Sequence, residues 1–360
     1  MFPPRHRAGT RPTSARSAHF APLAPGLARL LPGLGLSILA AAISWGVHVL
    51  LPAVSALVVA IVLGVVAANT ARLPAATAAG IAFSAKRLLR AGIVFLGLQL
   101  VLSDILDLGA PMLLVVVGIV AGGLGSTIVL GRMLRVRPGL TLLIGCGFSI
   151  CGAAAVAGAA GVTDPDGEAE EDTITAVALG VIFRTLMNPL APLLAGMVGL
   201  DAHTAGLWTG GSVHEIAQVV AAGGIIGTGA LTVAVIVKLA RVLLLAPVVA
   251  ALSIRQRRLA RAGAAPDTPT ASAKLPPIVP LFVVGFIAMV LARSFLPLPG
   301  VALSTGNLLQ TGLLSAAMFG LGCGVKIRAL AEVGPRPFAL AGLSTLLVAA
   351  IAGTGIMLVG

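Results

Sequence analysis

Two cations lie one helical turn apart in the middle of a long apolar run. Lys238 and Arg241 fall within residues 230–252, whose other side chains are almost all aliphatic. In a membrane-spanning helix, Lys238 would lie roughly 15 Å from one end and roughly 21 Å from the other, which is farther than its side chain can snorkel. A charge at that depth costs ~2.5 to 3.5 kcal/mol and usually marks a partner, a cavity or an ion path. The pair therefore predicts an anion-binding site.

Residues 210–218 (GGSVHEIAQ) form the most polar stretch inside any apolar run. Paired glycines before Ser212, with Glu215 three residues later, predict a capping box for a half-helix that begins inside the membrane. Glu215 either neutralises Lys238 or Arg241, or else Glu215 or His214 binds and releases a coupling proton. A zinc-protease motif is excluded because Gln218 stands where a second histidine is required.

A run of small residues precedes this stretch. Apart from Phe148, Ile150 and Val156, every residue from 145 to 161 is Gly, Ala, Ser or Cys. Such a run suits close helix packing. It also suits a helix break at 147–152, where free backbone N–H groups and a half-helix N-terminus would face an anion. The two interpretations are compatible.

Arg184 is a third cation within an apolar run, followed by Asn188, Pro189 and Pro192. It would either bind substrate or hold carbonyl groups freed by Pro189. If all are ionised, the three cations exceed Glu215 by about two positive charges, a balance that suits a small oxyanion. The predicted substrate ligands are Lys238, Arg241, Ser149, Gly152, Ser212, Gln218 and Arg184, and the predicted coupling-ion residues are Glu215 and His214.

The composition is that of a polytopic, all-α membrane protein. Of 360 residues, 58% are hydrophobic and 10% charged, and apolar stretches of membrane-spanning length recur along the chain. The net charge of +12 comes from basic residues in short connections, so it indicates membrane topology rather than binding to nucleic acid. The three cysteines lie in apolar contexts and form no disulfide framework.

The hydropathy pattern predicts about eleven spans, within a range of about 10–11 transmembrane helices. The spans are residues 31–51, 54–70, 91–106, 110–130, 139–160, 173–199, 205–226, 229–252, 277–296, 305–324 and 337–358. Residues 74–90 are predicted to form an in-plane amphipathic helix. Residues 1–26 are predicted as a disordered cytoplasmic tail, residues 27–358 as one transmembrane transporter domain, and residues 254–276 as a cytoplasmic linker.

The distribution of Lys and Arg predicts an inner-membrane, multi-pass protein with a cytoplasmic N-terminus. The predicted span map puts the acidic loop 164–172 on the side opposite to the basic connections. Two internal similarities suggest inverted repeats, 88–109 with 313–334 and 149–161 with 212–224. The span map makes 139–160 and 205–226 parallel, however, so one predicted span is expected to be a re-entrant hairpin instead.

At these residues the chain resembles the YeiH family of bacterial inner-membrane proteins, which are labelled sulfate exporters. The resemblance rests on KRLLRAGIVFLG (86–97), SICG (149–152), GSVHEIAQVVAA (211–222) and VKLARVLLLAP (237–247), with Glu215 where many relatives have Asp. It implies kinship with cation/proton antiporters and bile acid symporters, which are built from inverted repeats with two broken, crossed helices.

The leading hypothesis is a secondary active transporter that exports a small anion, sulfate-like or sulfonate-derived, coupled to H⁺ or Na⁺ by alternating access. The alternatives are a Na⁺/H⁺ type cation antiporter and a passive anion channel. An enzyme is not expected, because His214 and Glu215 alone are too sparse for catalysis, and no cofactor, metal or ATP-binding loop is predicted. The expected partners are a small inorganic anion, H⁺ or Na⁺ and the lipid bilayer, with a homodimer as one option for assembly.

Overall fold

A computed structural model describes residues 27–52, 54–70, 73–164, 169–262, 280–325 and 334–359, and every regular element in these ranges is a helix. Five helices are long and apolar enough to cross a membrane, judged by length and composition: Arg29–Leu50, Gly109–Met133, Glu170–Val198, Thr228–Leu259 and Pro335–Val359. The predicted all-α membrane fold is confirmed. The predicted tail 1–26 lies outside the described residues.

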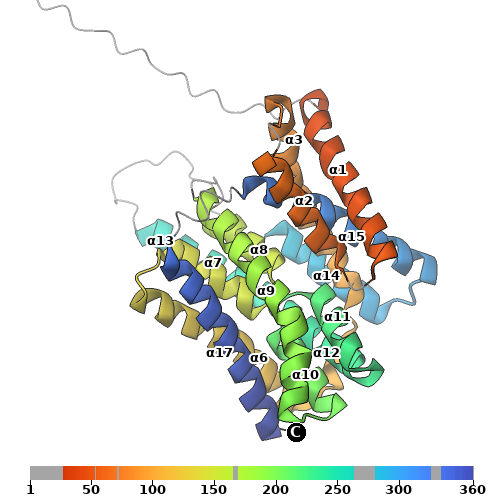
Figure 1. Cartoon of the computed structure of the whole chain (residues 1–360), viewed down its shortest axis with the longest axis vertical. Helices are drawn as coiled ribbons and strands as arrows, with labels where there is room; N and C mark the ends of the chain where they lie inside the picture. Colours follow the sequence, from red (N-terminus) through yellow and green to blue (C-terminus); the bar gives the residue numbers. More distant parts are fainter. Residues whose placement is uncertain are drawn as a thin grey trace, which may run out of the picture.

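The chain forms helices of very different lengths (Figure 1). In the first part these are α1 (Leu27–Leu50), α2 (Ala56–Thr70), η1 (Ala75–Thr77), α3 (Ala78–Phe83), η2 (Ser84–Leu88), α4 (Leu89–Leu96), η3 (Gly97–Gln99), α5 (Leu102–Leu106) and α6 (Gly109–Met133). The later ones are α7 (Pro138–Ser149), α8 (Ala153–Thr163), α9 (Glu170–Val198), α10 (Ala202–Ser212), α11 (Ile216–Ile226), α12 (Thr228–Leu243), α13 (Leu245–Ala262), α14 (Leu281–Phe295), α15 (Gly300–Gly324) and α17 (Pro335–Val359).

The helices pack as two groups. The first bundle comprises α1–α4 with α14 and α15, where α2 packs on α15 and α4 packs on α14 and α15, and the short helix α5 contacts α14 as well as α6 and α12. The second bundle comprises α6–α13 with α17, where α10 packs on α12 and α17. Figure 1 shows the two groups side by side. A Cβ atom on Gly64 would lie 2.3 Å from the Phe319 carbonyl oxygen, and one on Gly322 would lie 2.3 Å from that of Ile61, so α2 and α15 approach this closely only through glycine.

One continuous helix runs from Ala75 to Gln99, with a π-helical segment, η2, inside it. The predictions of an in-plane helix at 74–90 and a separate span at 91–106 are therefore wrong. The physical reason is that Gly80 packs on α1, where a Cβ atom would lie 2.2 Å from the Leu30 carbonyl oxygen. This segment is thus packed between helices instead of lying on a membrane surface.

Helices α7 and α8 form a re-entrant hairpin whose two ends lie together. At its start, Arg137 pairs with Asp172 in the first turn of α9 (Nη2 to Oδ1, 2.8 Å). At its end, Asp164 accepts a hydrogen bond from the backbone N–H of Ala169 (2.9 Å), which directly precedes α9. Both ends of the hairpin are therefore beside the start of α9, and the predicted span 139–160 enters and leaves on the same side.

Helices α10 and α11 form a second hairpin, at the opposite end of the bundle. A Cβ atom on Gly206 of α10 would lie 2.6 Å from the Ala230 carbonyl oxygen, and one on Gly223 of α11 would lie 2.9 Å from the Leu231 Cα. Both arms therefore flank the start of α12. The predicted span 205–226 is also a hairpin rather than a crossing, so the two hairpins enter from opposite ends.

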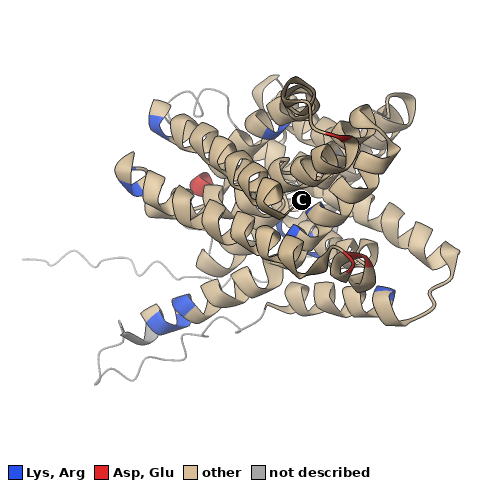
Figure 2. Ribbon diagram, turned by 90° about the horizontal axis from the view of Figure 1, so that it is seen from below, with Lys and Arg blue, Asp and Glu red and all other residues tan. Residues whose placement is uncertain are grey.

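These hairpins correct the predicted topology. The acidic residues Glu170 and Asp172 lie at the same end as Lys86 and Arg137, because Lys86 Nζ is 3.6 Å from Glu170 Oε1 and Arg137 pairs with Asp172. We call this the basic end. The expectation that the acidic loop lies opposite the basic residues is wrong, because the hairpin brings the chain back to its starting side. Figure 2 shows that charged residues, coloured blue and red, occupy only a small part of the helical ribbon.

The opposite end holds the connection between α9 and α10. There Asp201 caps α10, accepting hydrogen bonds from the backbone N–H of His203 (2.9 Å) and Thr204 (3.1 Å) and from the Thr204 hydroxyl (2.6 Å). The Thr204 side-chain bond, with the backbone bonds, holds the pKa of Asp201 below its usual range. At the basic end, α13 continues to Ala262, so the first part of the predicted linker 254–276 is helical, and residues 263–279 lie outside the described residues.

The orientation of the two hairpins bears on the predicted internal repeat. Residues 149–161 run from the first tip toward the basic end, whereas residues 212–224 run from the second tip toward the opposite end. The segments are therefore antiparallel, as an inverted repeat requires. The conflict that the span map produced disappears, and common descent of the two segments stays a prediction.

Candidate functional site

The two hairpin tips, residues 150–152 and 213–215, meet at the middle of α12. The Lys238 ammonium donates hydrogen bonds to one carbonyl oxygen from each tip, that of Ile150 at 2.7 Å and that of Val213 at 3.0 Å. Lys238 is completely buried. One side chain therefore connects two hairpins that enter from opposite ends of the bundle.

Arg241 makes the same kind of contact with more carbonyl groups. Its guanidinium donates to the carbonyl oxygens of Phe148 (3.1 Å), Ser149 (2.8 and 3.2 Å), Gly210 (3.0 Å), Gly211 (2.7 Å) and Val213 (3.1 Å). These are carbonyl groups at the ends of α7 and α10, which have no N–H partner within their own helix. A positive charge at a helix C-terminus is also favoured by the helix dipole.

Position on α12 explains why these two residues act together. Lys238 and Arg241 are three residues apart, which places them on one face of the helix. Each hydrogen bond to a charged group contributes about 1.5 to 3 kcal/mol, enough to offset the cost of burying the charge. The sequence predicted that both cations bind substrate, whereas here their head groups bind backbone carbonyl groups and hold the tips together.

His214 also ties the tips to their surroundings. Its Nδ1 lies 2.9 Å from the Phe148 carbonyl oxygen of the first hairpin, and its Nε2 lies 3.3 Å from the Thr345 hydroxyl of α17. The imidazole is buried, with its ring centroid 4.9 Å from that of Phe148. Of the two predicted coupling-ion residues, His214 is thus enclosed among α7, α10 and α17.

Glu215 pairs with Arg184 of α9, with Oε2 3.0 Å from Nη1. Both side chains are buried. The sequence suggested other partners for both residues. Arg184 was a candidate to bind substrate or to hold carbonyl groups freed by Pro189, and Glu215 was a candidate to neutralise a cation of α12. In the structure they pair with each other instead. One buried ion pair therefore joins the second tip to α9.

Gly152 in the first tip lies against the same arginine. Its φ of +78° lets the chain reverse between α7 and α8, in a region that favours glycine. A Cβ atom there would lie 3.1 Å from the Arg184 Nη1. Gly152 therefore both allows the turn and leaves room for the ion pair between Arg184 and Glu215.

The other predicted site residues lie near the tips, and they differ in whether their side chains have hydrogen-bond partners. The Ser149 hydroxyl and the Gln218 side-chain oxygen are buried and have no hydrogen-bond partner among the described residues. The Ser212 hydroxyl donates to the Trp208 carbonyl oxygen (2.7 Å). The predicted capping box at Ser212 is wrong, because Ser212 is the last residue of α10 and Glu215 holds the N-cap position of α11.

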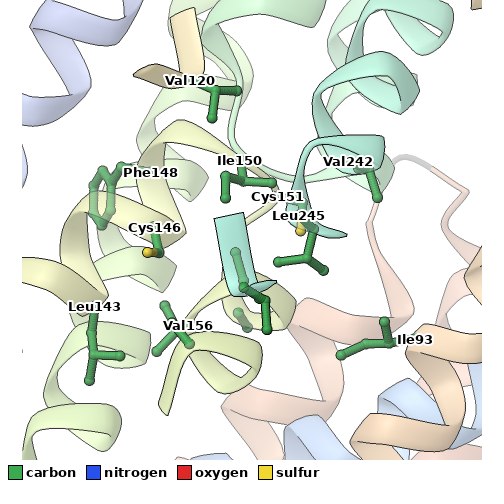
Figure 3. Close-up of a cluster of buried hydrophobic side chains, with 14 of the residues drawn as sticks. Ile93, Val120, Leu143, Cys146, Phe148, Ile150, Cys151, Val156, Val242 and Leu245 are labelled. Carbon is green, nitrogen blue, oxygen red and sulfur yellow. The ribbon is translucent and has the colours of Figure 1, made fainter. Parts of the chain in front are cut away.

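Hydrophobic packing keeps the first tip in place. Figure 3 shows Ile150 and Cys151 of the tip beside Val242 and Leu245, at the junction of α12 and α13, with Val156 and Cys146 on the two arms below. All of these residues belong to one buried cluster. The tip is thus held by apolar contacts as well as by the two cations of α12.

A cavity of about 290 Å³ lies between the two bundles and reaches both tips. From the second bundle it is lined by Cys151, Ala153 and Ala154 of the first hairpin and by Glu215 and Ile216 of the second. Helices α8 and α11 therefore both begin at this cavity. The first N–H groups of a helix have no partner within it and carry a partial positive charge, so two such ends suit an anion.

From the first bundle the cavity is lined by neutral polar residues that the sequence analysis missed. Gln99 Nε2 donates to the side-chain oxygens of Asn307 (3.0 Å) and Gln310, and all three residues line the cavity with His48 and Ser55. Amide side chains within the apolar runs 91–106 and 305–324 were the available signal. They are far apart in sequence, so only the packing of α15 on the continuous helix brings them together.

Comparison with known proteins identifies relatives along nearly the whole chain. A family model described as conserved hypothetical protein 698 matches residues 30–341. A UPF0324 membrane protein of Corynebacterium glutamicum is 57% identical over 332 residues, covering 92% of this chain and 93% of the relative. Those of Pseudomonas aeruginosa (39%, covering 94% and 93%) and Agrobacterium fabrum (36%, covering 81% of each) are also similar. No solved structure matches the chain.

Proposed function

This chain belongs to the membrane-protein family described as conserved hypothetical protein 698, and from that premise we propose that it is a secondary active transporter that moves a small anion by alternating access. The resemblance to the YeiH family is confirmed, since that family corresponds to this one. We expect export of a sulfate-like or sulfonate-derived anion, as the resemblance implies. The basic end would face the cytoplasm of an inner membrane.

One observation carries the proposal: two half-helices, α8 and α11, begin at the same cavity deep inside a membrane protein. Their C-terminal counterparts, α7 and α10, end on Lys238 and Arg241. The cations thus neutralise the negative helix ends, and the positive helix ends remain to attract an anion. The neutral amide groups of Gln99, Asn307 and Gln310 would supply further hydrogen-bond donors without adding charge.

The ion pair of Arg184 with Glu215 offers a way to couple anion movement to a proton. In this structure the two charges neutralise each other at 3.0 Å, and Glu215 lines the cavity. A proton on Glu215 would leave Arg184 with an uncompensated positive charge beside Gly152. An anion entering the cavity would restore the balance. Proton and anion would therefore bind and move together, which favours H⁺ over Na⁺ as the coupling ion; the summed gradients of the two set the direction, so export would require a high internal anion concentration.

The proposal is tested with purified protein in liposomes under an imposed pH gradient, with radiolabelled sulfate and sulfite as probes. We expect the wild type to concentrate at least one of them. Glu215→Gln should lose this accumulation, because the glutamine is neutral at every pH, but should retain exchange of labelled for unlabelled anion. Glu171→Gln is the matched control, since Glu171 is an exposed carboxylate at the basic end.

Accumulation by Glu215→Gln at the wild-type level would remove proton coupling at this residue, and no anion flux by the wild type would remove the transporter assignment for these anions. Two alternatives have their own outcomes. Sodium-for-proton exchange that disappears in Glu215→Gln, with no anion flux, would indicate a cation antiporter whose counter-ion is Arg184 rather than Lys238. Single-channel currents in planar bilayers would indicate a passive anion channel.

A further inference from the structure

A second cavity, of about 80 Å³, lies toward the basic end. Its lining includes Lys86 and Arg90 of the continuous helix, Gly161 of α8 and Thr173 of α9, together with two carboxylates, Glu170, which pairs with Lys86, and Asp164, which accepts a hydrogen bond from the Ala169 N–H. A volume of this size accommodates several waters, and hence a small ion. Helices α4, α8 and α15 line both cavities, and the residues that line the first cavity lie farther from the basic end.

The two cavities are separated by a thin apolar barrier. On the continuous helix, Leu96 lines the first cavity and Ile93 the second; on α15, Met318 lines the first and Leu321 the second. On α8 the corresponding residues are Ala154 and Ala157. Each pair is three residues apart, which is about 4.5 Å along a helix. Less than one helical turn of apolar side chains therefore closes a route between the cavities.

Arg90 is the distinctive group of the second cavity. Lys86 is paired with Glu170, but none of the ion pairs found among the described residues uses Arg90. The half-buried Arg90 guanidinium lies over the ring of Phe282, 6.0 Å from its centroid. A Cβ atom on Gly161 would lie 2.9 Å from the Arg90 Nη2, so the small residue of α8 makes room for the head group.

We propose that Arg90 forms a second anion-binding site on the basic-end side of this barrier, for an oxyanion that the guanidinium binds through paired hydrogen bonds. The identity of that oxyanion as the transported one rests on the proposed function. Together, the barrier and the two cavities define a route along α8, with one binding site on each side of a gate.

The test measures anion binding at Arg90 without measuring transport. Thr173→Cys, in a background where Cys146, Cys151 and Cys323 are alanine, places a thiol in the wall of the second cavity with little change in size. Labelling by a small methanethiosulfonate reagent is followed in phosphatidylcholine liposomes with rising sodium sulfate, at ionic strength matched with sodium chloride. We expect sulfate to slow the labelling.

In Arg90→Gln the half-protecting sulfate concentration should rise about tenfold, equivalent to about 1.4 kcal/mol, and Arg90→Lys should restore part of the protection. Arg87→Gln is the matched control, because Arg87 is an exposed cation on the same helix and does not line the cavity. Equal protection in Arg90→Gln and the parent protein, or no protection by sulfate in the parent, would overturn the assignment.

A lipid phosphate group shares this chemistry, so a second arm uses liposomes that contain anionic phospholipid. Protection by the anionic lipid alone, with no added effect of sulfate, would overturn a site for a soluble anion. The outcome is separable from the proposed function. Sulfate protection in a protein that accumulates no anion would refute the transporter and retain the Arg90 site, and accumulation without protection would do the reverse.

Discussion

At the scale of single residues, Lys238 and Arg241 determine how the site is built. Isolated cations at this depth cost several kcal/mol, and here the carbonyl ends of two hairpins meet that cost. The same bonds satisfy backbone groups that would otherwise be unpaired at the tips. Charge and backbone therefore stabilise each other, and neither the tips nor the buried cations would be stable alone.

We predict that Lys238→Met lowers the thermal stability of the protein. Methionine has nearly the length of lysine but leaves the Ile150 carbonyl oxygen without this donor, at a cost of about 1 to 3 kcal/mol for that buried group, whereas the Val213 carbonyl oxygen keeps its hydrogen bond from Arg241. Arg241→Gln should lower stability further, because Arg241 serves more carbonyl groups. Thermal unfolding in detergent measures the effect.

Lys86→Met is the control for this prediction. Its ion pair is half exposed, with side-chain exposures of 53% for both partners, and such pairs contribute about 0 to 1 kcal/mol. A Lys238→Met protein that melts at the wild-type temperature would refute the role of Lys238 in holding the tips together. If, in addition, sulfate raises the melting temperature of the wild type but not of this variant, Lys238 binds the anion directly.

At the scale of elements, the barrier on the α4–α8–α15 seam is the part that must open. Helix α8 contributes small residues to it, Ala154 and Ala157, whereas α15 contributes the larger Met318 and Leu321. A helix face of small residues packs closely and yet interlocks little with its neighbours. The two bundles can therefore separate or slide at this seam with few side chains to rearrange.

We predict that Met318→Ala connects the two cavities and produces an anion leak. Met318 is 2% exposed and lines the first cavity, so its truncation should remove part of a barrier less than one turn thick. Passive efflux of sulfate from loaded liposomes, with no pH gradient, is the measurement. Met112→Ala is the matched control, because Met112 is equally buried, 4% exposed, on α6.

Both methionine variants should lose about 2 to 5 kcal/mol of stability, the usual cost of such a truncation in a core. Only Met318→Ala should leak. Equal leakage from both would show that general loosening of the helices, and not the loss of this barrier, causes the flux.

At the scale of the whole molecule, the hairpins decide which connections share a side of the membrane. A map in which 139–160 and 205–226 cross puts the start of α9 opposite the basic end and the start of α10 on the same side as that end. Two re-entrant hairpins reverse both assignments: the pair of Arg137 with Asp172 places the start of α9 at the basic end, and the packing of Gly206 and Gly223 on the start of α12 places the second hairpin at the opposite end.

We predict that Glu171→Cys reacts with a membrane-impermeant thiol reagent only from the cytoplasmic side, and His203→Cys only from the other side. Both positions are exposed at the two ends of the bundle. The measurement uses intact cells and inverted vesicles, with Cys146, Cys151 and Cys323 replaced by alanine. The reverse pattern would contradict the prediction, either because both segments cross the membrane or because the basic end faces away from the cytoplasm.

The sequence by itself determined the class of the protein and the places where its helices break. Composition and hydropathy are sums over local residues, so they suffice for an all-α membrane protein. A glycine such as Gly152 and polar residues such as Glu215 within apolar runs mark breaks for local reasons. Lys238 and Arg241 on α12 could be recognised from the sequence for the same reason, because the free-energy cost of burying each charge depends on its depth within its own helix.

Only the tertiary structure decided the direction of the chain after each break and the partner of each charge. A hairpin and a crossing helix have the same hydropathy, so the direction after a break depends on the helices that pack against both arms. Carbonyl partners such as Ile150 and Val213 are invisible in sequence, since every residue has a carbonyl group. Arg184 and Glu215 are distant in the chain, as are Gln99 and Asn307, so only the folded structure brings each pair together.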